Sequence, residues 1–158
     1  MEGFTLALAL VDAIPVLLFG ASMIMIAARC NSVLFVIGAV LSMLAGCFKV
    51  LWKIILATKK KDVKWLNKGF LPFMGAGWIL ILLSLILMAV RGANTAWAAG
   101  LVRMPSVLLL ALWLLLMLFM VWYRKKRFVN EDAKKNWTAQ IINCVAMASL
   151  FIAILLAR

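Results

Sequence analysis

The chain has 158 residues, of which 68% are apolar and 14% are charged, and its formal net charge is +12. This composition excludes a water-soluble domain of that size and predicts a single transmembrane helical domain over residues 1–158. Histidine is absent, and the cysteines Cys30, Cys47 and Cys144 form no C-x-x-C pair, so we expect no metal site, no haem and no other cofactor.

Five apolar segments are each long enough to cross a hydrocarbon core of ~30 Å as a helix. The sequence therefore predicts an all-α integral membrane protein, a compact bundle of five transmembrane helices. Pro72 is expected in the first turn of the third helix, where its missing N–H does little harm. The segments cover residues 4–28, 33–57, 69–90, 104–123 and 137–157.

Basic residues are concentrated in two of the connections between segments. Six lie within residues 53–68 and six within 124–135, while the opposite side holds four arginines. This distribution is the topology signal of membrane proteins and not a nucleic-acid-binding pattern, so we expect no nucleic-acid partner. It predicts that both basic loops and the N-terminus are cytoplasmic and that the C-terminus is outside, in a bacterial-type cytoplasmic membrane.

Asp12 is the only acidic residue within any of the five segments. A carboxylate in a membrane span needs a compensating partner, because removing water from the charge is costly. Pro15 cannot donate a hydrogen bond to the carbonyl of Val11, so it kinks the helix and releases an acceptor close to Asp12. An acid beside a missing backbone hydrogen bond points to a specialised site.

Small residues in the second and third segments predict close helix packing. Gly38, Ser42 and Gly46 recur at intervals of four residues, which lets another helix approach closely. Gly75 and Gly77 offer the same opportunity near the start of the third segment.

Polar residues of three segments are predicted to share one depth. Lys49 and Lys53 continue the small-residue face of the second segment, and Lys49 and Asp12 each lie eight residues from the cytoplasmic end of their segments, ~12 Å deep. Asn143 of the fifth segment lies at a similar depth, with Gln140 on the same face. We expect Asp12 and Lys49 to form an ion pair whose hydrogen bonding Asn143 or Gln140 completes, and these four residues to bind a substrate or an ion.

Two other interpretations of the lysines remain open. Lys49 and Lys53 can extend their long side chains to the lipid headgroups. The pair with Asp12 can also be structural and fix the register of the first two segments. The Pro15 kink favours a functional site, since it releases the Val11 carbonyl toward the same layer.

Enzymatic activity is not expected, because the sequence lacks the histidines, cysteine pairs and clustered acids that membrane enzymes use. The sequence favours a small transporter or channel-like protein with a polar site in the cytoplasmic third of the bilayer. A bundle of this size has little room for an enclosed pathway, so we expect a homo-oligomer. The alternative is a non-transporting subunit, assembly factor or regulator that binds a partner membrane protein and uses the Asp12/Lys49 pair structurally.

The fourth segment consists almost entirely of Leu, Met, Phe and Trp, which predicts a peripheral helix against lipid. A basic cluster follows it directly: Arg124, Lys125, Lys126 and Arg127. Each basic residue near an anionic leaflet contributes about 1 kcal/mol of attraction, so we expect this cluster to bind the headgroups of anionic lipids. The alternative is that these charges only set the topology.

Overall fold

The structure, a computed structural model, describes residues 5–91, 96–126 and 133–157. Over these ranges it is all-helical, with no strand. Five of its helices are long and apolar enough to cross a membrane, which confirms the predicted all-α class and the five-helix membrane bundle. The helices are α1 (Leu6–Cys30), α2 (Val33–Lys59), α3 (Lys64–Val90), α4 (Ala96–Leu101), α5 (Ser106–Lys126) and α6 (Ala133–Leu156).

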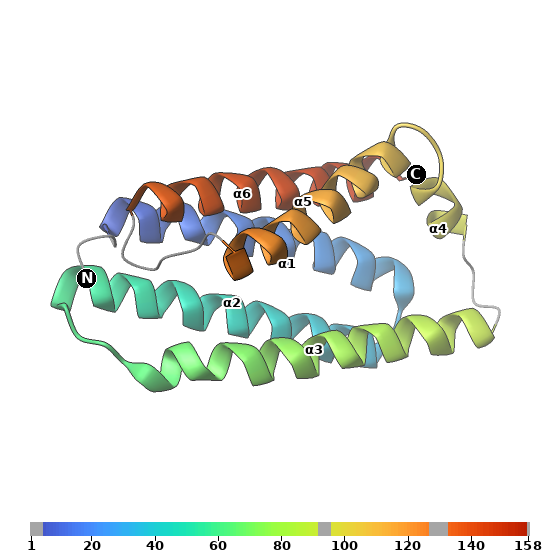
Figure 1. The fold of residues 1–158 in the computed structure, drawn as a ribbon. Coiled ribbons are helices and arrows are strands. Elements are labelled where there is room, and N and C mark those ends of the chain that lie inside the picture. Colours follow the sequence, from blue (N-terminus) through green and yellow to red (C-terminus); the bar gives the residue numbers. More distant parts are fainter. Residues whose placement is uncertain (1–4, 92–95, 127–132, 158) are drawn as a thin grey trace.

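The five long helices form an open arc in the order α3–α2–α1–α6–α5 (Figure 1). Helix α2 packs along both α3 and α1, and helix α6 packs along both α1 and α5. Among the residues that the structure describes, no comparable packing joins α3 to α5. These two helices are therefore the ends of the arc.

The turn between α1 and α2 consists of two residues, Asn31 and Ser32, whose conformational preferences favour a helix end and a helix start. Asn31 ends α1 in the left-handed conformation, with φ of 44°, and its N–H donates to the carbonyl of Ala27 at 3.2 Å. Asn adopts this conformation at a lower cost than most residues with a side chain. Ser32 then begins α2, where its hydroxyl accepts from the backbone N–H of Phe35 at 3.4 Å. The two helices are thereby antiparallel neighbours (Figure 1).

Small residues bring the backbones of α2 and α3 into contact. A Cβ on Gly38 would lie 2.7 Å from the carbonyl oxygen of Gly77, and a Cβ on Gly77 would lie 2.7 Å from that of Gly38. The hydroxyl of Ser42 also lies directly against Gly77. In a bilayer such close approach supplies the van der Waals contact that holds helices together, because lipid leaves little hydrophobic driving force between them.

The two remaining glycines of the predicted packing set behave differently. Gly46 faces α1, where its Cβ would lie 3.0 Å from both γ-carbons of Val16. A Cβ on Gly75 would meet no described atom within 4 Å. Small residues therefore join α3, α2 and α1 into one layer, and Gly75 takes no part in it.

Helix α3 begins at Lys64, five residues before the predicted start at Gly69. The loop before it is shortened to residues 60–63, and Pro72 lies inside the helix and not in its first turn. The first turn of α3 carries polar side chains, so a prediction based on hydropathy does not include it in the span. A helix can nevertheless extend past the apolar core without losing its backbone hydrogen bonds. As a result Asn67 lies on a helix that faces α2.

The region after α3 also departs from the prediction. The connection of residues 91–103 contains a short helix, α4, that the sequence analysis did not anticipate. Helix α5 exposes Leu108, Leu115 and Leu118, as a lipid-facing helix does, but its Met120 is buried. The prediction of a helix against lipid therefore holds for one face of α5, and the face with Met120 packs inside the protein.

Arg29 fixes the relation between the first and last helices. Its Nη1 donates to the carbonyls of Ile154 at 3.2 Å and Ala157 at 3.0 Å, at the end of α6. Carbonyls at a helix C-terminus lack hydrogen-bond donors within the helix and carry partial negative charge. A guanidinium supplies the donors and the positive charge together. The ends of α1 and α6 are thereby aligned, and the two helices run parallel (Figure 1).

The glycine contacts predict different responses to the same substitution. Gly77→Ala should lower the free energy of unfolding by ~1–3 kcal/mol, because its new methyl group must displace the backbone at Gly38 and the Ser42 hydroxyl. Gly75→Ala is the matched control on the same helix and should be neutral or slightly stabilising. Unfolding in mixed micelles measures both. Equal effects of the two substitutions would contradict the close α2–α3 contact.

Candidate functional site

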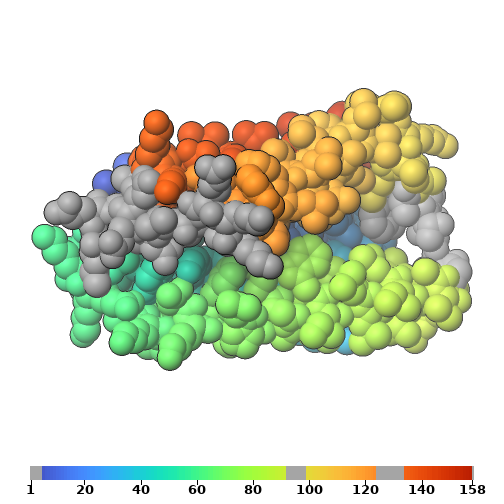
Figure 2. Space-filling model, in the orientation of Figure 1, coloured from blue at the N-terminus to red at the C-terminus, as the bar shows by residue number. Residues whose placement is uncertain are grey.

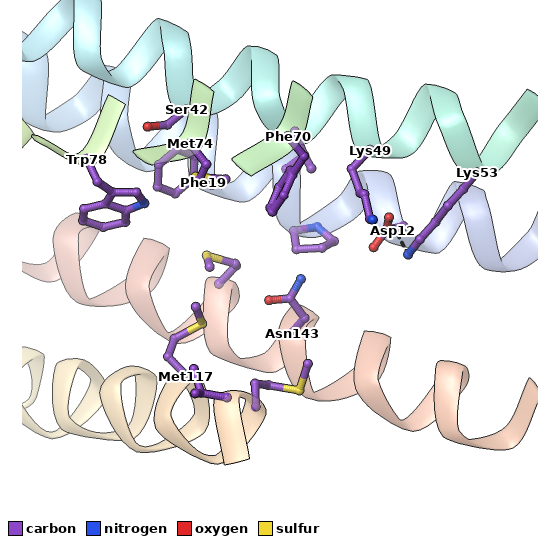
Figure 3. Close-up of a pocket in the computed structure, with 16 residues that line it drawn as sticks. Asp12, Phe19, Ser42, Lys49, Lys53, Phe70, Met74, Trp78, Met117 and Asn143 are labelled. Carbon is purple, nitrogen blue, oxygen red and sulfur yellow. Dashed lines mark ion pairs between the residues drawn. The ribbon is translucent and has the colours of Figure 1, made fainter. Parts of the chain in front are cut away.

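A cavity of about 280 Å³ lies inside the arc of helices (Figure 3). Side chains of α1, α2 and α3 form one side of it, and side chains of α5 and α6 form the other. Charged and amide groups gather at one end, and apolar side chains surround the rest (Figure 3). The cavity is therefore amphipathic along its length.

An ion pair between α1 and α2 forms the polar end. The Nζ of Lys53 lies 2.8 Å from Oδ2 of Asp12, and each side chain is only 9% exposed. Burying two charges is costly, and their direct contact offsets part of that cost. The side chain of Lys53 is therefore directed into the bundle and does not extend toward the lipid headgroups.

The sequence predicted Lys49 as the basic partner of Asp12, and the structure shows that Lys53 contacts the same carboxylate directly. Helix α1 begins at Leu6 and helix α2 continues to Lys59, so Asp12 and Lys53 are each six residues from the end of their helix. The pairing of Asp12 with Lys49 stays a prediction.

Lys49 lines the same cavity but turns toward α3. Among its contacts, its Nζ donates to Oδ1 of Asn67 and lies 4.6 Å from the ring centroid of Trp52 and 5.7 Å from that of Phe70. Aromatic faces attract an ammonium group without neutralising it. Lys49 therefore brings a second ammonium group to the polar end, held between α2 and α3.

The two amides of α6 lie in different environments. Asn143 projects from α6 into the cavity, toward the side that carries Asp12 and Lys49 (Figure 3). Gln140 is buried but does not line the cavity, and its Oε1 has no hydrogen-bond partner among the described residues. The structure thus brings Asp12, Lys49 and Asn143 together, adds Lys53, and leaves Gln140 outside.

Pro15 leaves the carbonyl of Val11 without its usual donor within the helix, and α6 lies beside that carbonyl. Pro15 lies inside α1, lines the cavity, and cannot donate to the carbonyl of Val11. The Sγ of Cys144 on α6 lies 3.8 Å from that carbonyl oxygen, within reach of a weak thiol hydrogen bond. The released carbonyl is therefore used to join two helices, and Cys144 has a structural role that sequence spacing did not reveal.

Aromatic and methionine side chains form the apolar part of the cavity. The rings of Phe19 and Trp78 lie 6.2 Å apart between centroids, at 46° to each other. Met74 of α3, Met117 of α5 and Met147 of α6 contribute flexible thioethers to the walls. Methionine adapts to ligands of different shape and contacts aromatic rings favourably, so this part can accommodate an apolar group.

Most of these apolar lining residues were not identified from the sequence. Phe19 and Trp78 lie in helices rich in apolar residues, where a cavity-lining position and a lipid-facing one look alike. Met117 belongs to a segment with no polar face, and Asn67 was assigned to a loop. The only usable signal was the small-residue face of α2, which ends at the cavity through Ser42 and Gly46.

The structure describes only part of the basic cluster predicted to bind lipid. Arg124, Lys125 and Lys126 belong to the last turn of α5, and Arg127 lies outside the described residues. The connection between α2 and α3, which belongs to the first basic stretch, lies at the end of the molecule where α2 ends (Figure 1). Lipid binding by the cluster stays a prediction.

The residues that line the cavity offer polar groups at one end and apolar groups along the rest. They supply one carboxylate, two ammonium groups, one amide and one serine hydroxyl. Such a set can hold the charged part of a solute, while rings and thioethers contact its apolar part. Comparisons with protein-family models, curated proteins and solved structures find no match to this chain.

The ion pair predicts energetic coupling between Asp12 and Lys53. Asp12→Asn should destabilise the protein strongly when Lys53 is present, because a buried ammonium then loses its counter-charge. Adding Lys53→Met should recover at least ~1 kcal/mol relative to additive losses. A double-mutant cycle of unfolding free energies in mixed micelles measures this coupling. The parallel cycle with Lys68→Met, which removes an exposed lysine that does not line the cavity, is the control and should show no coupling. Absence of coupling between Asp12 and Lys53 would contradict the pairing.

Proposed function

We propose that this protein is a small membrane transporter and that the cavity is its solute-binding site. The observation that carries the proposal is the position of a buried ion pair at one end of an apolar cavity inside a bundle of membrane-spanning helices. Charged groups within a membrane protein are costly to bury, and in transporters they mark substrate and ion pathways. Sites near mid-membrane, beside irregular helices, are typical of that class.

The arc of helices supplies a route to the site. The cavity is lined by Phe70, Met74 and Trp78 of α3 and by Met117, Met120 and Val121 of α5. Figure 2 shows α3 and α5 facing each other across a seam on this surface of the molecule. Since α3 and α5 are the two ends of the arc, separating them opens the cavity without breaking the α1–α2 or α1–α6 contacts. A solute can then reach the site from the lipid or from the end that carries the ion pair.

In this proposal the ion pair responds to loading. A carboxylate can accept several hydrogen bonds and an ammonium has three donors, so Asp12 and Lys53 can each contact a solute as well as one another. A charged solute or a proton at Asp12 changes the attraction between α1 and α2. Occupancy of the site is thereby linked to the relative position of the two helices that form its wall.

The orientation we propose has the polar end of the cavity on the cytoplasmic side. The connection between α2 and α3, which belongs to the first basic stretch, lies at that end, and positively charged loops are retained in the cytoplasm. The twelve basic residues within residues 53–68 and 124–135 also favour contact with anionic lipids. The cavity is formed within one chain, so the site does not require a second copy, and the homo-oligomer stays a prediction.

Labelling in intact cells tests the orientation. In a background without native cysteines, Lys60→Cys should not react with a membrane-impermeant thiol reagent, because it lies between α2 and α3 at the proposed cytoplasmic end. Arg91→Cys, at the exposed end of α3, is the control and should be labelled. Labelling of position 60 and protection of position 91 would reverse the proposed orientation.

A structural role of the ion pair is the second candidate. Asp12 and Lys53 contact each other directly and connect neighbouring helices, which is also what a pair that only fixes helix register would do. In that case the protein is a subunit, assembly factor or regulator, and a stable complex with another membrane protein should co-purify with it.

Solute flux into reconstituted vesicles separates the two functions. We expect the protein to carry a member of a panel of organic anions, cations and zwitterions, and we expect Asp12→Asn to reduce that flux at least tenfold while helix content by circular dichroism is retained. Asp62→Asn is the matched control, because it removes an exposed acid that bonds to Trp52 outside the cavity. Unchanged flux in Asp12→Asn would rule out Asp12 as part of the pathway, and no flux for any solute would favour the structural role.

A further inference from the structure

We infer that the solute is a small aromatic carboxylate, bound with its anionic group at Lys49 and its ring between α3 and α5. This inference rests on the proposed function only in that the bound molecule is the transported one. It names the substrate class of the same cavity, and it is carried by the charge, the wall chemistry and the volume of that cavity.

The charge of the polar end favours an anion. Two lysines and one aspartate line it, and Lys53 already contacts Asp12. The lining therefore carries one more positive than negative charge. An ammonium group has three donors, so Lys49 can bond to a solute carboxylate in addition to Asn67. A carboxylate is attracted by the net positive charge, whereas a cation has to compete with Lys53 for Asp12.

The apolar walls favour a ring over an alkyl chain. Phe19, Phe70 and Trp78 present three aromatic side chains to the cavity, and Met74, Met117 and Met147 surround them. Offset and edge-to-face contacts between rings, together with sulfur–aromatic contacts, stabilise a bound aromatic solute beyond the free energy that its buried apolar area contributes. The methionines are flexible, so the ring can carry different substituents.

The volume suits a small solute. The cavity provides about 280 Å³, which accommodates a single ring with a short acidic side chain. Phenylacetate therefore represents the class.

Calorimetric titration of the purified full chain in detergent tests the inference. Phenylacetate should bind, and 2-phenylethanol, phenethylamine and cyclohexylacetate should each bind at least about tenfold more weakly, because they lack the charge, reverse it, or lack the ring. Transport is not needed for this measurement, so its failure is distinguishable from failure of the proposed transporter, which the flux panel decides.

Two lysine variants locate the anionic group. Lys49→Gln should weaken phenylacetate about tenfold or more and leave the affinity for 2-phenylethanol within about twofold. Lys68→Gln removes the same charge from an exposed position on α3 that does not line the cavity, and should leave phenylacetate binding within about twofold. A thermal melt of each variant confirms that it is folded, and Trp78→Leu provides an independent probe of the ring site by weakening phenylacetate more than cyclohexylacetate.

Three outcomes would overturn the inference. The first is absence of phenylacetate binding to the folded protein. The second is equal binding of phenylacetate and phenethylamine, which would show that the polar end does not select an anion. The third is equal weakening by Lys49→Gln and Lys68→Gln, which would show attraction to the charged surface and not to the cavity.

Discussion

The contact between Asp12 and Lys53 is the constraint around which the other helices are placed. A carboxylate and an ammonium that are both buried in a helical bundle must remain close to each other, so α1 and α2 cannot slide past each other without separating Asp12 from Lys53. Gly46 lets the two helices approach closely enough for the pair to form, since its missing side chain leaves room for Val16. Register and packing therefore support one another at this interface.

Helix α2 combines the structural and chemical roles of the bundle. One side of it contacts the backbone of α3 through Gly38 and Ser42, and its last turns carry Lys49 and Lys53 into the cavity. Because these residues are on one rigid helix, the depth of the lysines follows from the position of the glycine contact. The α2–α3 contact thus determines where the polar end of the cavity lies.

The second half of the bundle, α5 and α6, closes the cavity. Helix α6 is attached to α1 by Arg29 at one end and by the Cys144 thiol near Pro15. Helix α5 reaches the rest of the bundle mainly through α6 and faces the cavity with methionines. The cavity therefore has methionine side chains on its α5 wall and a direct ion pair between α1 and α2 on the opposite wall.

The five spans, the helical class and the close-packing residues of α2 follow from the sequence alone, because apolar length and small-residue spacing are local properties of a helix. The presence of a buried acid that needs a basic partner was also evident from Asp12. Only the tertiary structure showed that Lys53 contacts Asp12, because the relative depth of residues on separate helices depends on where each helix begins and ends. It also decided that Phe19, Trp78 and Met117 face a common cavity, since an apolar residue facing a cavity and one facing lipid have the same chemistry and differ only in which helix stands opposite.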